Sequence, residues 1–261
     1  MDDFLLDELK TSHEGIAELE APAANLPILE EMSKAGLFLG HKKSKTHPRM
    51  KPYIFTTRNG TEIIDLAQTL EIMEKAMEFV KSKLSKSPTS ALLLVGTTPA
   101  SKTAVENLAK KLNLPNVTGR WLGGTLTNFG TISKRIAYFK KLRADREAGR
   151  LDKYTKKERL GFNREIEKLT EKFSGIENMS VLPDVLFAVE VTSHITAIRE
   201  AKRMKIPVVA LVNTDADPAL VDYPIPVNDR GKASVEWVLA KLESAILEAR
   251  LLKVEKVENS K

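Results

Sequence analysis

The stretch PDVLFAVEVTSHITAIREAKRMKIPVVALVNT, residues 183–214, holds two apolar runs with a helix-length segment between them. The runs PDVLFAVEV and PVVALVNT lack the alternation of apolar and polar residues that is typical of a sheet with one solvent-exposed face. Their continuous apolar pattern predicts strands that are buried on both faces. The intervening SHITAIREAKRMKI has the mixed charged and apolar pattern of a helix. A buried strand, a helix and a second buried strand are typical of a parallel sheet covered by helices, so we predict an open α/β sheet.

The same alternation continues on both sides of this stretch. Further strands are predicted at 91–97 (ALLLVGT), 116–119 (NVTG) and 222–227 (DYPIPV). Further helices are predicted at 27–36, 67–84, 99–114 and from 233 to about 255. Two short strands, YIFTT and EIID, flank Arg58-Asn59-Gly60, and this pattern indicates a β-hairpin.

The sheet pattern is interrupted at 131–172 by a segment dense in Lys, Arg and Glu. A break at 146–158 contains Gly149 and a capping pattern, Thr155 followed by Glu158, which ends one helix and begins another. Two apolar stripes are assigned, one to each helix: Ile132, Ile136, Phe139 and Leu142, and Leu160, Ile166, Leu169 and Phe173. We therefore predict a protruding antiparallel helical hairpin inserted into the sheet domain.

The predicted organisation has four parts. These are an acidic extension at 1–26, one discontinuous α/β domain at 27–130 and 174–250, an inserted helical hairpin at 131–173, and a polar tail at 251–261.

Composition excludes several classes of protein. The chain has 261 residues and no cysteine, which excludes a disulfide scaffold, a thiolate zinc site and a cysteine nucleophile. No apolar run approaches the ~20 residues that cross a bilayer, and the N-terminus is acidic where a secretory signal would be basic. We expect a cytoplasmic protein that does not enter a membrane.

The charge is unevenly distributed. The chain carries a formal +6, but residues 1–26 hold seven acids against one lysine, so the leader carries −6 and the remainder +12. A basic body of this size favours a polyanionic partner such as nucleic acid, although charge alone does not decide the matter.

Catalytic chemistry in such a sheet is expected in the loops after the strands. The first of these loops, LLLVGTTPASKTAV, resembles half of a phosphate loop, but Ser101 stands before Lys102 where the motif has a second glycine. A mononucleotide site around Gly96 therefore competes with a simpler interpretation, a strand-to-helix turn whose threonine caps the helix.

Two further loops hold candidate ligands. EVTSHITAIRE supplies Glu190, His194 and Glu200; Glu190 and His194 are candidates for a metal site or a base, but the spacing places no third ligand. Asp215 and Asp217 could hold Mg²⁺, yet an Asp-x-Asp-Pro sequence is also a common turn, and we favour the turn. No catalytic set emerges, so we do not expect an enzyme.

The loops are better suited to RNA. The segment GHKKSKTHPRMKPY, residues 40–53, is too rich in proline and small polar residues to be helical. Its cations can contact phosphates while its rings stack on bases; a solvated loop is the competing interpretation. The cations are Lys42, Lys43, Lys45, Arg49 and Lys51, with His41, His47 and Tyr53 between them.

A second such segment is GRWLGGTLTNFGT, residues 119–131. Gly123-Gly124 permits unusual backbone conformations, Arg120 can pair with a phosphate, and Asn128 can donate to backbone oxygens. A tight glycine turn that packs Trp121 into the core is the competing account, and both can hold together.

Eight blocks of sequence together resemble one family. In this order they are AGLFLGH, HPRMKPYIFTTRNG, IIDL, LLLVGT, RWLGGTLTN, LPDVLFAVEV, AIREAKRMKIPVVALVNTDADP and YPIPVNDRG. Their order and spacing resemble those of the bacterial small-subunit ribosomal protein S2 family, from about Leu26 to Leu247.

This resemblance implies a flavodoxin-like α/β domain with an inserted coiled-coil hairpin. It implies a structural, non-enzymatic role in the small ribosomal subunit, bound to ribosomal RNA near the junction of head and body and to neighbouring ribosomal proteins, including the mRNA-binding protein one. No cofactor, membrane or homo-oligomer is expected. By matching positions it implies RNA contacts at Lys42, Lys43, Arg49, Lys51, Arg58, Arg120, Lys134, Arg135 and Lys157.

The chain departs from the family pattern at three places. Thr46-His47 replaces an aromatic-asparagine pair, and the segment 190–194 has fewer acids and histidines than members that hold a metal there. The leader 1–26 has no counterpart. It either covers a basic RNA-facing surface before assembly, contacts a protein neighbour, or is a disordered extension without function. The rival functions are a small-molecule enzyme that uses the Gly96 loop and a free RNA-binding regulator.

Overall fold

The computed structural model describes residues 25–86 and 91–258, and its centre is a five-stranded parallel sheet. The strands are β4 (Leu92–Val95), β5 (Asn116–Val117), β6 (Val185–Ala188), β7 (Val208–Val212) and β8 (Tyr223–Pro226). Their spatial order is β5-β4-β6-β7-β8, which is the 2-1-3-4-5 order of flavodoxin-like folds. The predicted open α/β sheet is confirmed.

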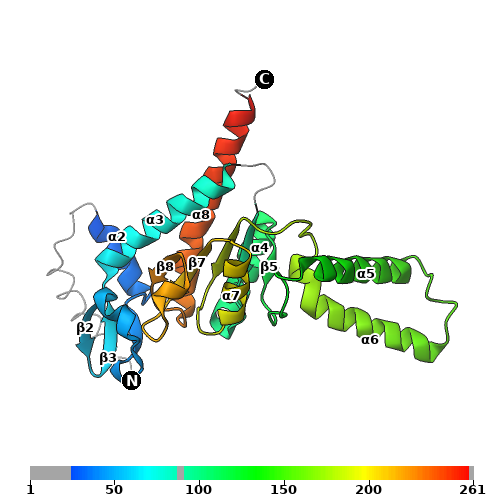
Figure 1. Cartoon of the computed structure of the whole chain (residues 1–261), viewed down its shortest axis with the longest axis horizontal. Helices are drawn as coiled ribbons and strands as arrows, with labels where there is room; N and C mark the ends of the chain where they lie inside the picture. Colours follow the sequence, from blue (N-terminus) through cyan, green and yellow to red (C-terminus); the bar gives the residue numbers. More distant parts are fainter. Residues whose placement is uncertain (1–24, 87–90, 259–261) are drawn as a thin grey trace.

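Helices cover both faces of this sheet (Figure 1). They are α2 (Leu26–Lys34), α3 (Leu66–Leu84), α4 (Pro99–Leu112), α7 (Ile195–Arg203) and α8 (Lys232–Glu258). Leu92 and Leu94 of β4 pack with α3, α4 and α8, whereas Leu93 and Val95 pack in a second cluster with α7. Because side chains alternate along a strand and both faces are covered, the strands are apolar throughout.

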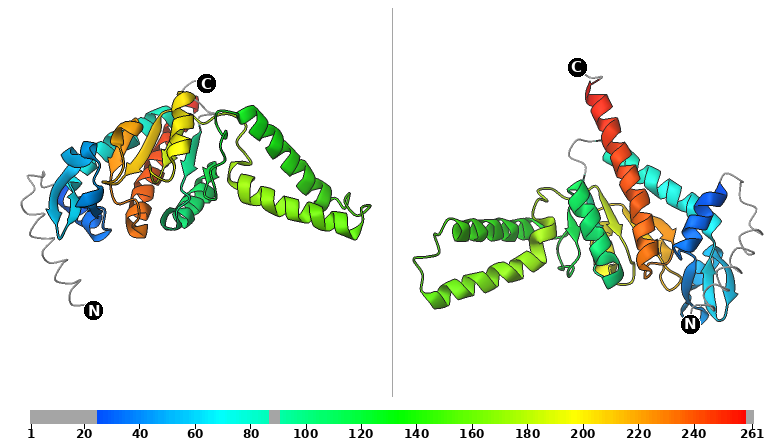
Figure 2. Two further views of the ribbon diagram at one scale, coloured as in Figure 1. Left: turned by 60° about the horizontal axis from the view of Figure 1, so that its bottom comes forward. Right: turned by 180° about the vertical axis from the view of Figure 1, so that it is seen from behind.

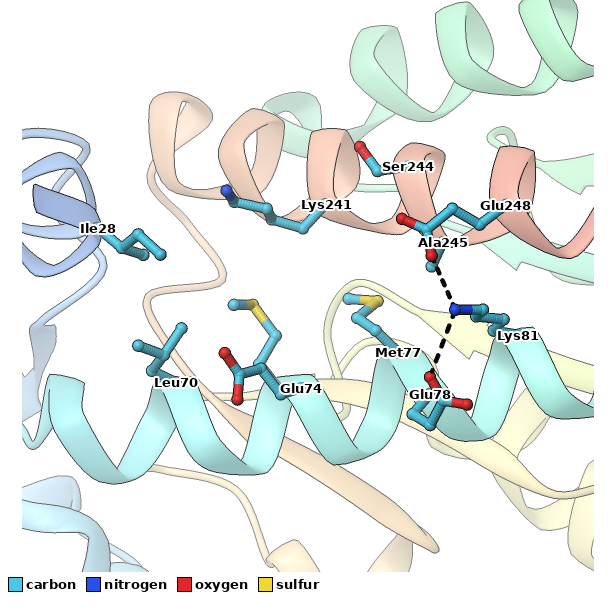
Figure 3. Close-up of a pocket in the computed structure, with 11 residues that line it drawn as sticks. Ile28, Leu70, Glu74, Met77, Glu78, Lys81, Lys241, Ser244, Ala245 and Glu248 are labelled. Atoms are coloured by element: carbon cyan, nitrogen blue, oxygen red, sulfur yellow. Dashed lines mark ion pairs between the residues drawn. The ribbon is translucent and has the colours of Figure 1, made fainter. Parts of the chain in front are cut away.

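Helices α3 and α8 pack side by side over one face of the sheet. An ion-pair bridge links them: Lys81 Nζ lies 2.9 Å from Glu248 Oε2 and 3.8 Å from Glu78 Oε2 (Figure 3). The hydrogen bond and charge of Glu248 raise the pKa of Lys81.

Helix α8 continues to Glu258, into the segment 251–261, which we expect from the sequence to be a polar tail. The helix can extend this far because its residues include no helix-breaking Gly or Pro before that point.

A smaller antiparallel sheet precedes α3, with strand order β1-β3-β2. Its strands are β1 (Leu39–Lys42), β2 (Ile54–Arg58) and β3 (Thr61–Ile64). The predicted hairpin is confirmed: Asn59 (φ 49°) and Gly60 (φ 75°) form its turn, both with the positive φ that a type I′ turn requires.

The segment 40–53, expected as a loop, is more ordered than its composition indicates. It begins in β1 and continues through two 3₁₀ helices, η2 (Lys43–Lys45) and η3 (Pro48–Tyr53). Proline fixes φ near the helical value, so Pro48 and Pro52 permit a 3₁₀ helix where a longer α-helix would be unfavourable. Two further short 3₁₀ helices are η4 (Ser174–Ile176) and η5 (Pro218–Leu220).

The interrupting segment forms two helices, α5 (Phe129–Glu147) and α6 (Lys156–Phe173), which extend away from the sheet (Figures 1 and 2). The predicted capping box is present: the Thr155 N–H donates to Glu158 Oε2 (2.9 Å), and the Glu158 N–H donates to Thr155 Oγ1 (3.4 Å). Residues buried between the helices and the sheet are Ile136, Phe139, Leu142, Ile166, Leu169 and Phe173.

The assignment of Leu160 to the apolar stripe of α6 is wrong, because this side chain is 51% exposed. Leu160 lies six residues before Ile166, which places it off the face that carries Ile166, Leu169 and Phe173. Phe162 lies four residues before Ile166 and is the residue that packs against this cluster.

The hairpin packing predicts unequal effects of two truncations. Phe139→Ala removes a ring with no exposed surface and is expected to cost about 3–5 kcal/mol of unfolding free energy. Leu160→Ala is expected to change it by less than about 0.5 kcal/mol. Urea denaturation followed by circular dichroism measures both, and equal losses in the two variants would contradict the packing described here.

Candidate nucleic-acid interface

Both basic segments lie at the carboxyl edge of the five-stranded sheet. The loop 118–128 follows β5 directly, and the segment 40–53 contacts residues 214–217, which follow β7. The two segments therefore lie at one edge, although 64 residues separate their nearest ends in the sequence.

The loop 118–128 is held by the carboxylate of Glu200 in α7. Glu200 Oε1 accepts hydrogen bonds from Trp121 Nε1 (3.1 Å) and the Gly124 N–H (2.8 Å). Oε2 accepts from the Leu126 N–H (3.0 Å) and from both the N–H and the hydroxyl of Thr127 (3.3 Å each). One side chain thus satisfies three backbone N–H groups that would otherwise be left unpaired in the turn.

The environment of Glu200 favours its ionised form. Burial of the carboxyl group raises its pKa, but the hydrogen bonds from Gly124, Trp121, Leu126 and Thr127 outweigh burial and lower the pKa below its ordinary value. Gly124 has φ +90°, a conformation that L-residues rarely adopt, which explains the glycine at this position. The second glycine, Gly123, has no such requirement.

The ends of this loop face solvent. Trp121 is half-buried against the second core cluster, as the glycine-turn account requires, while Arg120 and Asn128 are exposed. The two sequence interpretations are therefore compatible: a carboxylate fixes the middle of the loop, and the polar ends remain accessible.

The segment 40–53 is fastened to the end of β7 through Thr214. The His47 N–H donates to the Thr214 carbonyl, and the His41 N–H donates to Thr214 Oγ1, both at 2.8 Å. His41 Nε2 also lies 3.1 Å from Asp215 Oδ2. A Cβ atom on Gly40 would lie 2.7 Å from Thr214 Cγ2 and 2.8 Å from the Glu62 carbonyl oxygen, so only glycine allows this approach.

The cations of this segment project from a fixed backbone. Four of those predicted to contact RNA are exposed: Lys42, Lys43, Lys45 and Lys51. Arg58, at the end of β2, is exposed as well. Arg49 is also exposed, but its Nη1 lies 2.9 Å from Asp217 Oδ2, so its guanidinium is shared with a carboxylate. Asp217 also accepts from the Ala219 N–H (3.0 Å), which confirms the turn predicted for Asp215 and Asp217.

The predicted hairpin cations are exposed as well: Lys134 and Arg135 on α5, and Lys157 on α6. Figure 1 shows the small β1-β3-β2 sheet at one end of the long axis and the hairpin at the other, with the five-stranded sheet between them. The structure therefore does not gather the predicted residues into one compact site. It distributes them along an extended surface.

The position where flavodoxin-like folds bind ligands, between β4 and β6, is filled by His194. The Thr97 N–H donates to His194 Nε2 (3.1 Å), so Nδ1 carries the proton and donates to the Glu190 carbonyl (2.6 Å). Burial lowers the pKa of His194, against the opposing effect of the Glu190 carbonyl and charge. Both ring nitrogens are engaged within the fold, so the geometry gives no support for the proposed metal site at Glu190 and His194.

Asp229 is another buried acid at this edge. Burial raises the pKa of its carboxyl group to about 7; a hydrogen bond from Asn213 Nδ2 (2.9 Å) opposes this, and the charges of Glu190 and Asp215 add to it. Near neutral pH this carboxyl is therefore only partly ionised, and the edge is less negative than the number of its acidic residues suggests.

Among residues 25–86 and 91–258, no group of three or more acids and histidines could hold a metal ion.

The turn at Gly96, between β4 and α4, is filled by side chains of α4. Ser101, which replaces the second glycine of a phosphate loop, is fully buried, and a Cβ atom on Gly96 would lie 2.9 Å from its hydroxyl oxygen. Thr98 is the N-cap of α4, but its hydroxyl bonds to Ser101 Oγ (2.8 Å) rather than to a backbone N–H. The predicted strand-to-helix turn is present, but the expected threonine cap is wrong, because the Thr98 side chain makes no capping hydrogen bond to the helix backbone.

Glu200→Gln is expected to reduce the unfolding free energy by about 2–3 kcal/mol at pH 7, because an amide replaces a buried acceptor of several hydrogen bonds. Because the pKa of Glu200 is lower in the folded protein than its unfolded-state value of 4.5, the ionised carboxylate stabilises the fold at pH values above 4.5. This stabilisation is lost as the pH falls through the folded-state pKa. The difference from wild type should therefore shrink below pH 4.5. Urea titrations across pH measure it, with exposed Glu71→Gln as control; a difference independent of pH would refute the charged-acceptor role.

Gly40→Ala is expected to cost about 1–3 kcal/mol, because the added methyl group overlaps Thr214 and the Glu62 carbonyl. Gly161→Ala in α6 meets open space and is expected to stabilise the protein by about 0.5–1 kcal/mol through helix propensity. Thermal unfolding of the two variants gives opposite shifts if β1 is fastened as described.

The structure is thus an α/β protein with a covered parallel sheet, whose carboxyl edge is filled by its own side chains and bordered by exposed cations. The sequence profile of the family described as ribosomal protein S2 matches residues 32–249. The chain belongs to the ribosomal protein S2 family, a family of ribosomal structural proteins and not of enzymes.

Three relatives show the extent of this similarity, and each is named small ribosomal subunit protein uS2. The protein of Coprothermobacter proteolyticus is 42% identical over 222 residues, which cover 85% of this chain and 82% of that protein. That of Dictyoglomus turgidum is 41% identical, over 87% of this chain and 91% of its own length. That of Bifidobacterium longum is 41% identical, over 85% of this chain and 79% of its own length.

No helix among the described residues has the length and hydrophobicity of a membrane span.

Proposed function

We propose that this chain is a structural protein of the small ribosomal subunit that binds ribosomal RNA through the carboxyl edge of its sheet and through its hairpin. The observation that carries the proposal is the pairing of fixed backbone with exposed cations. Glu200 and Thr214 hold the two loops, and the basic side chains of these loops face solvent. Binding through preformed loops avoids the cost of ordering them on RNA. The relatives named above carry the name of this ribosomal component.

The proposed RNA contacts are Lys42, Lys43, Lys45, Arg49, Lys51, Arg58, Arg120, Asn128, Lys134, Arg135 and Lys157. Their spread along the long axis favours recognition of folded RNA by its shape and phosphates, with little reading of base sequence. Arg49 differs from the others, since it must leave or share Asp217 to reach a phosphate.

We extend the proposal to the parts of the chain. Residues 27–130 and 174–250 form the α/β domain, and 131–173 form an inserted coiled-coil hairpin. The coiled-coil hairpin is supported by the apolar residues of α6 that pack in the second core cluster. Phe162, Ile166, Leu169 and Phe173 are spaced by four, three and four residues, which is the spacing of a coiled-coil seam. The proposed partners are small-subunit ribosomal RNA and neighbouring ribosomal proteins, including the mRNA-binding protein one. The proposed location is the cytoplasmic ribosome.

The test is co-sedimentation of the tagged protein with small subunits on sucrose gradients at low and high salt. Wild-type protein is expected in the small-subunit peak. The triple variant Lys42→Ala, Lys43→Ala, Arg120→Ala is expected to dissociate at lower salt, with the log-log salt slope of binding reduced by about 2, since each phosphate contact contributes about 0.7–0.9.

The control removes the same charge from three other exposed lysines, Lys34, Lys75 and Lys110 on α2, α3 and α4. This control is expected to sediment like wild type. Wild-type protein that stays at the top of every gradient would refute the ribosomal role, and equal effects of the two triple variants would refute the assigned interface.

A further inference from the structure

A second basic surface lies at the opposite, amino edge of the sheet. A hollow of about 580 Å³ is formed there by the end of α3, the turn after α7 and the starts of β7 and β8. We call it the amino-edge groove, and the residues that matter in it are Phe79, Lys83, Lys202, Lys205, Asp222 and Tyr223.

The groove is positively charged. Three lysines face one carboxylate, and Asp222 Oδ2 already accepts a hydrogen bond from the Val208 N–H (2.8 Å). Among the described residues none of the three lysines makes an ion pair, in contrast to Lys81, which bridges Glu78 and Glu248. Lys202 Nζ instead donates to the Ala219 carbonyl (3.1 Å). The lysines are therefore available to an external anion.

Aromatic rings form part of the same groove. Phe79 and Tyr223 are stacked, with ring centroids 4.1 Å apart and an angle of 22° between the planes. Lys83 Nζ lies 5.7 Å from the Phe79 centroid. Flat rings beside lysines are the combination with which proteins hold single-stranded nucleic acid, because bases stack on rings while phosphates pair with cations.

The backbone at Lys205 gives an independent reason. Lys205 follows the end of α7 with φ +59°, a left-handed conformation in which glycine or asparagine is usual. The other non-glycine residues with positive φ among those described are Asn59 and Asn113. The Lys205 N–H donates to the Lys202 carbonyl (3.0 Å), so the helix end needs this conformation but not a lysine. Non-glycine residues in this strained conformation cluster at functional sites, and the exposed Lys205 side chain lines the groove.

We propose that the amino-edge groove binds single-stranded RNA, with phosphates on Lys83, Lys202 and Lys205 and an unpaired base against the Phe79–Tyr223 pair. The proposal rests on the ribosomal role proposed above and adds a second contact, on the edge of the sheet away from the loops at 40–53 and 118–128. The protein then contacts RNA from both edges of one rigid sheet.

The test uses the full chain and a fluorescein-labelled ten-nucleotide uridine RNA, with binding followed by fluorescence anisotropy at several salt concentrations. The variant Lys83→Gln, Lys202→Gln, Lys205→Gly is expected to bind at least 10-fold more weakly and to reduce the log-log salt slope by about 2, at about 0.7 per phosphate contact. The matched control is Lys34→Gln, Lys75→Gln, Lys110→Gln, which is expected to bind within about 2-fold of wild type.

Lys205→Gly separates stability from binding. It is expected to raise the Tm by about 2 °C, because glycine relieves the left-handed strain, and to weaken RNA binding about 3-fold, as the loss of one phosphate contact requires. Weaker binding by a more stable protein would not arise from a merely structural role. Unchanged binding in this variant and in the triple variant would overturn the proposal.

A decaglutamate peptide serves as competitor. Displacement of the RNA by an equimolar amount of this peptide would also overturn the proposal, in favour of an acidic protein segment as the occupant. The two proposals fail separately: wild-type protein absent from small subunits on gradients refutes the ribosomal role, whereas wild-type protein in subunits together with unaltered RNA binding by the groove variants refutes only the groove.

Discussion

Five hydrogen bonds converge on the buried carboxylate of Glu200, and through them α7 fixes the loop that links β5 to the hairpin. Without a buried acceptor, the N–H groups of Gly124, Leu126 and Thr127 would need water, and the loop could not pack against the sheet. The loop in turn sets where α5 begins. The position of Arg120, the direction of the hairpin and the burial of Trp121 thus depend on one side chain.

The rest of the carboxyl edge is built in a similar way, with side chains and backbone of the sheet domain used as anchors for loops. Thr214 holds the segment 40–53, and His194 links the loops after β4 and β6. In flavodoxin-like proteins this edge receives a small ligand. Here the protein's own groups occupy it, and the chemistry left exposed is a border of ammonium and guanidinium groups, which suits an extended polyanion better than a metabolite.

The sheet could be predicted from the sequence because strands buried on both faces are continuous apolar runs, and the hairpin break could be predicted because a capping box is a local signal. Long-range contacts could not. Strand β1 exists through pairing with β3, the Arg49–Asp217 pair joins residues 168 positions apart, and Leu160 was misplaced because the stripe on α6 has Phe162 instead.

The role of Glu200 was also hidden in the sequence. In the sequence it stands beside Glu190 and His194, in a loop with candidate ligands. The feature that could have revealed its role is the position of Glu200 on α7. Ala197, three residues before it, and Ala201, one residue after it, are both buried. A carboxylate on this buried face of the helix needs hydrogen-bond donors from inside the protein. The identity of the donors, 73–79 positions away, depends on the fold.

The most direct test of the account is amide hydrogen exchange measured by NMR on wild-type protein and on Glu200→Gln. The account predicts slow exchange of the Gly124, Leu126 and Thr127 N–H groups in the wild type and much faster exchange of these three in the variant, with the amides of β6 and β7 unchanged. Exchange of the three amides at unprotected rates in the wild type, or equal protection in the two proteins, would contradict the claim that this carboxylate holds the loop.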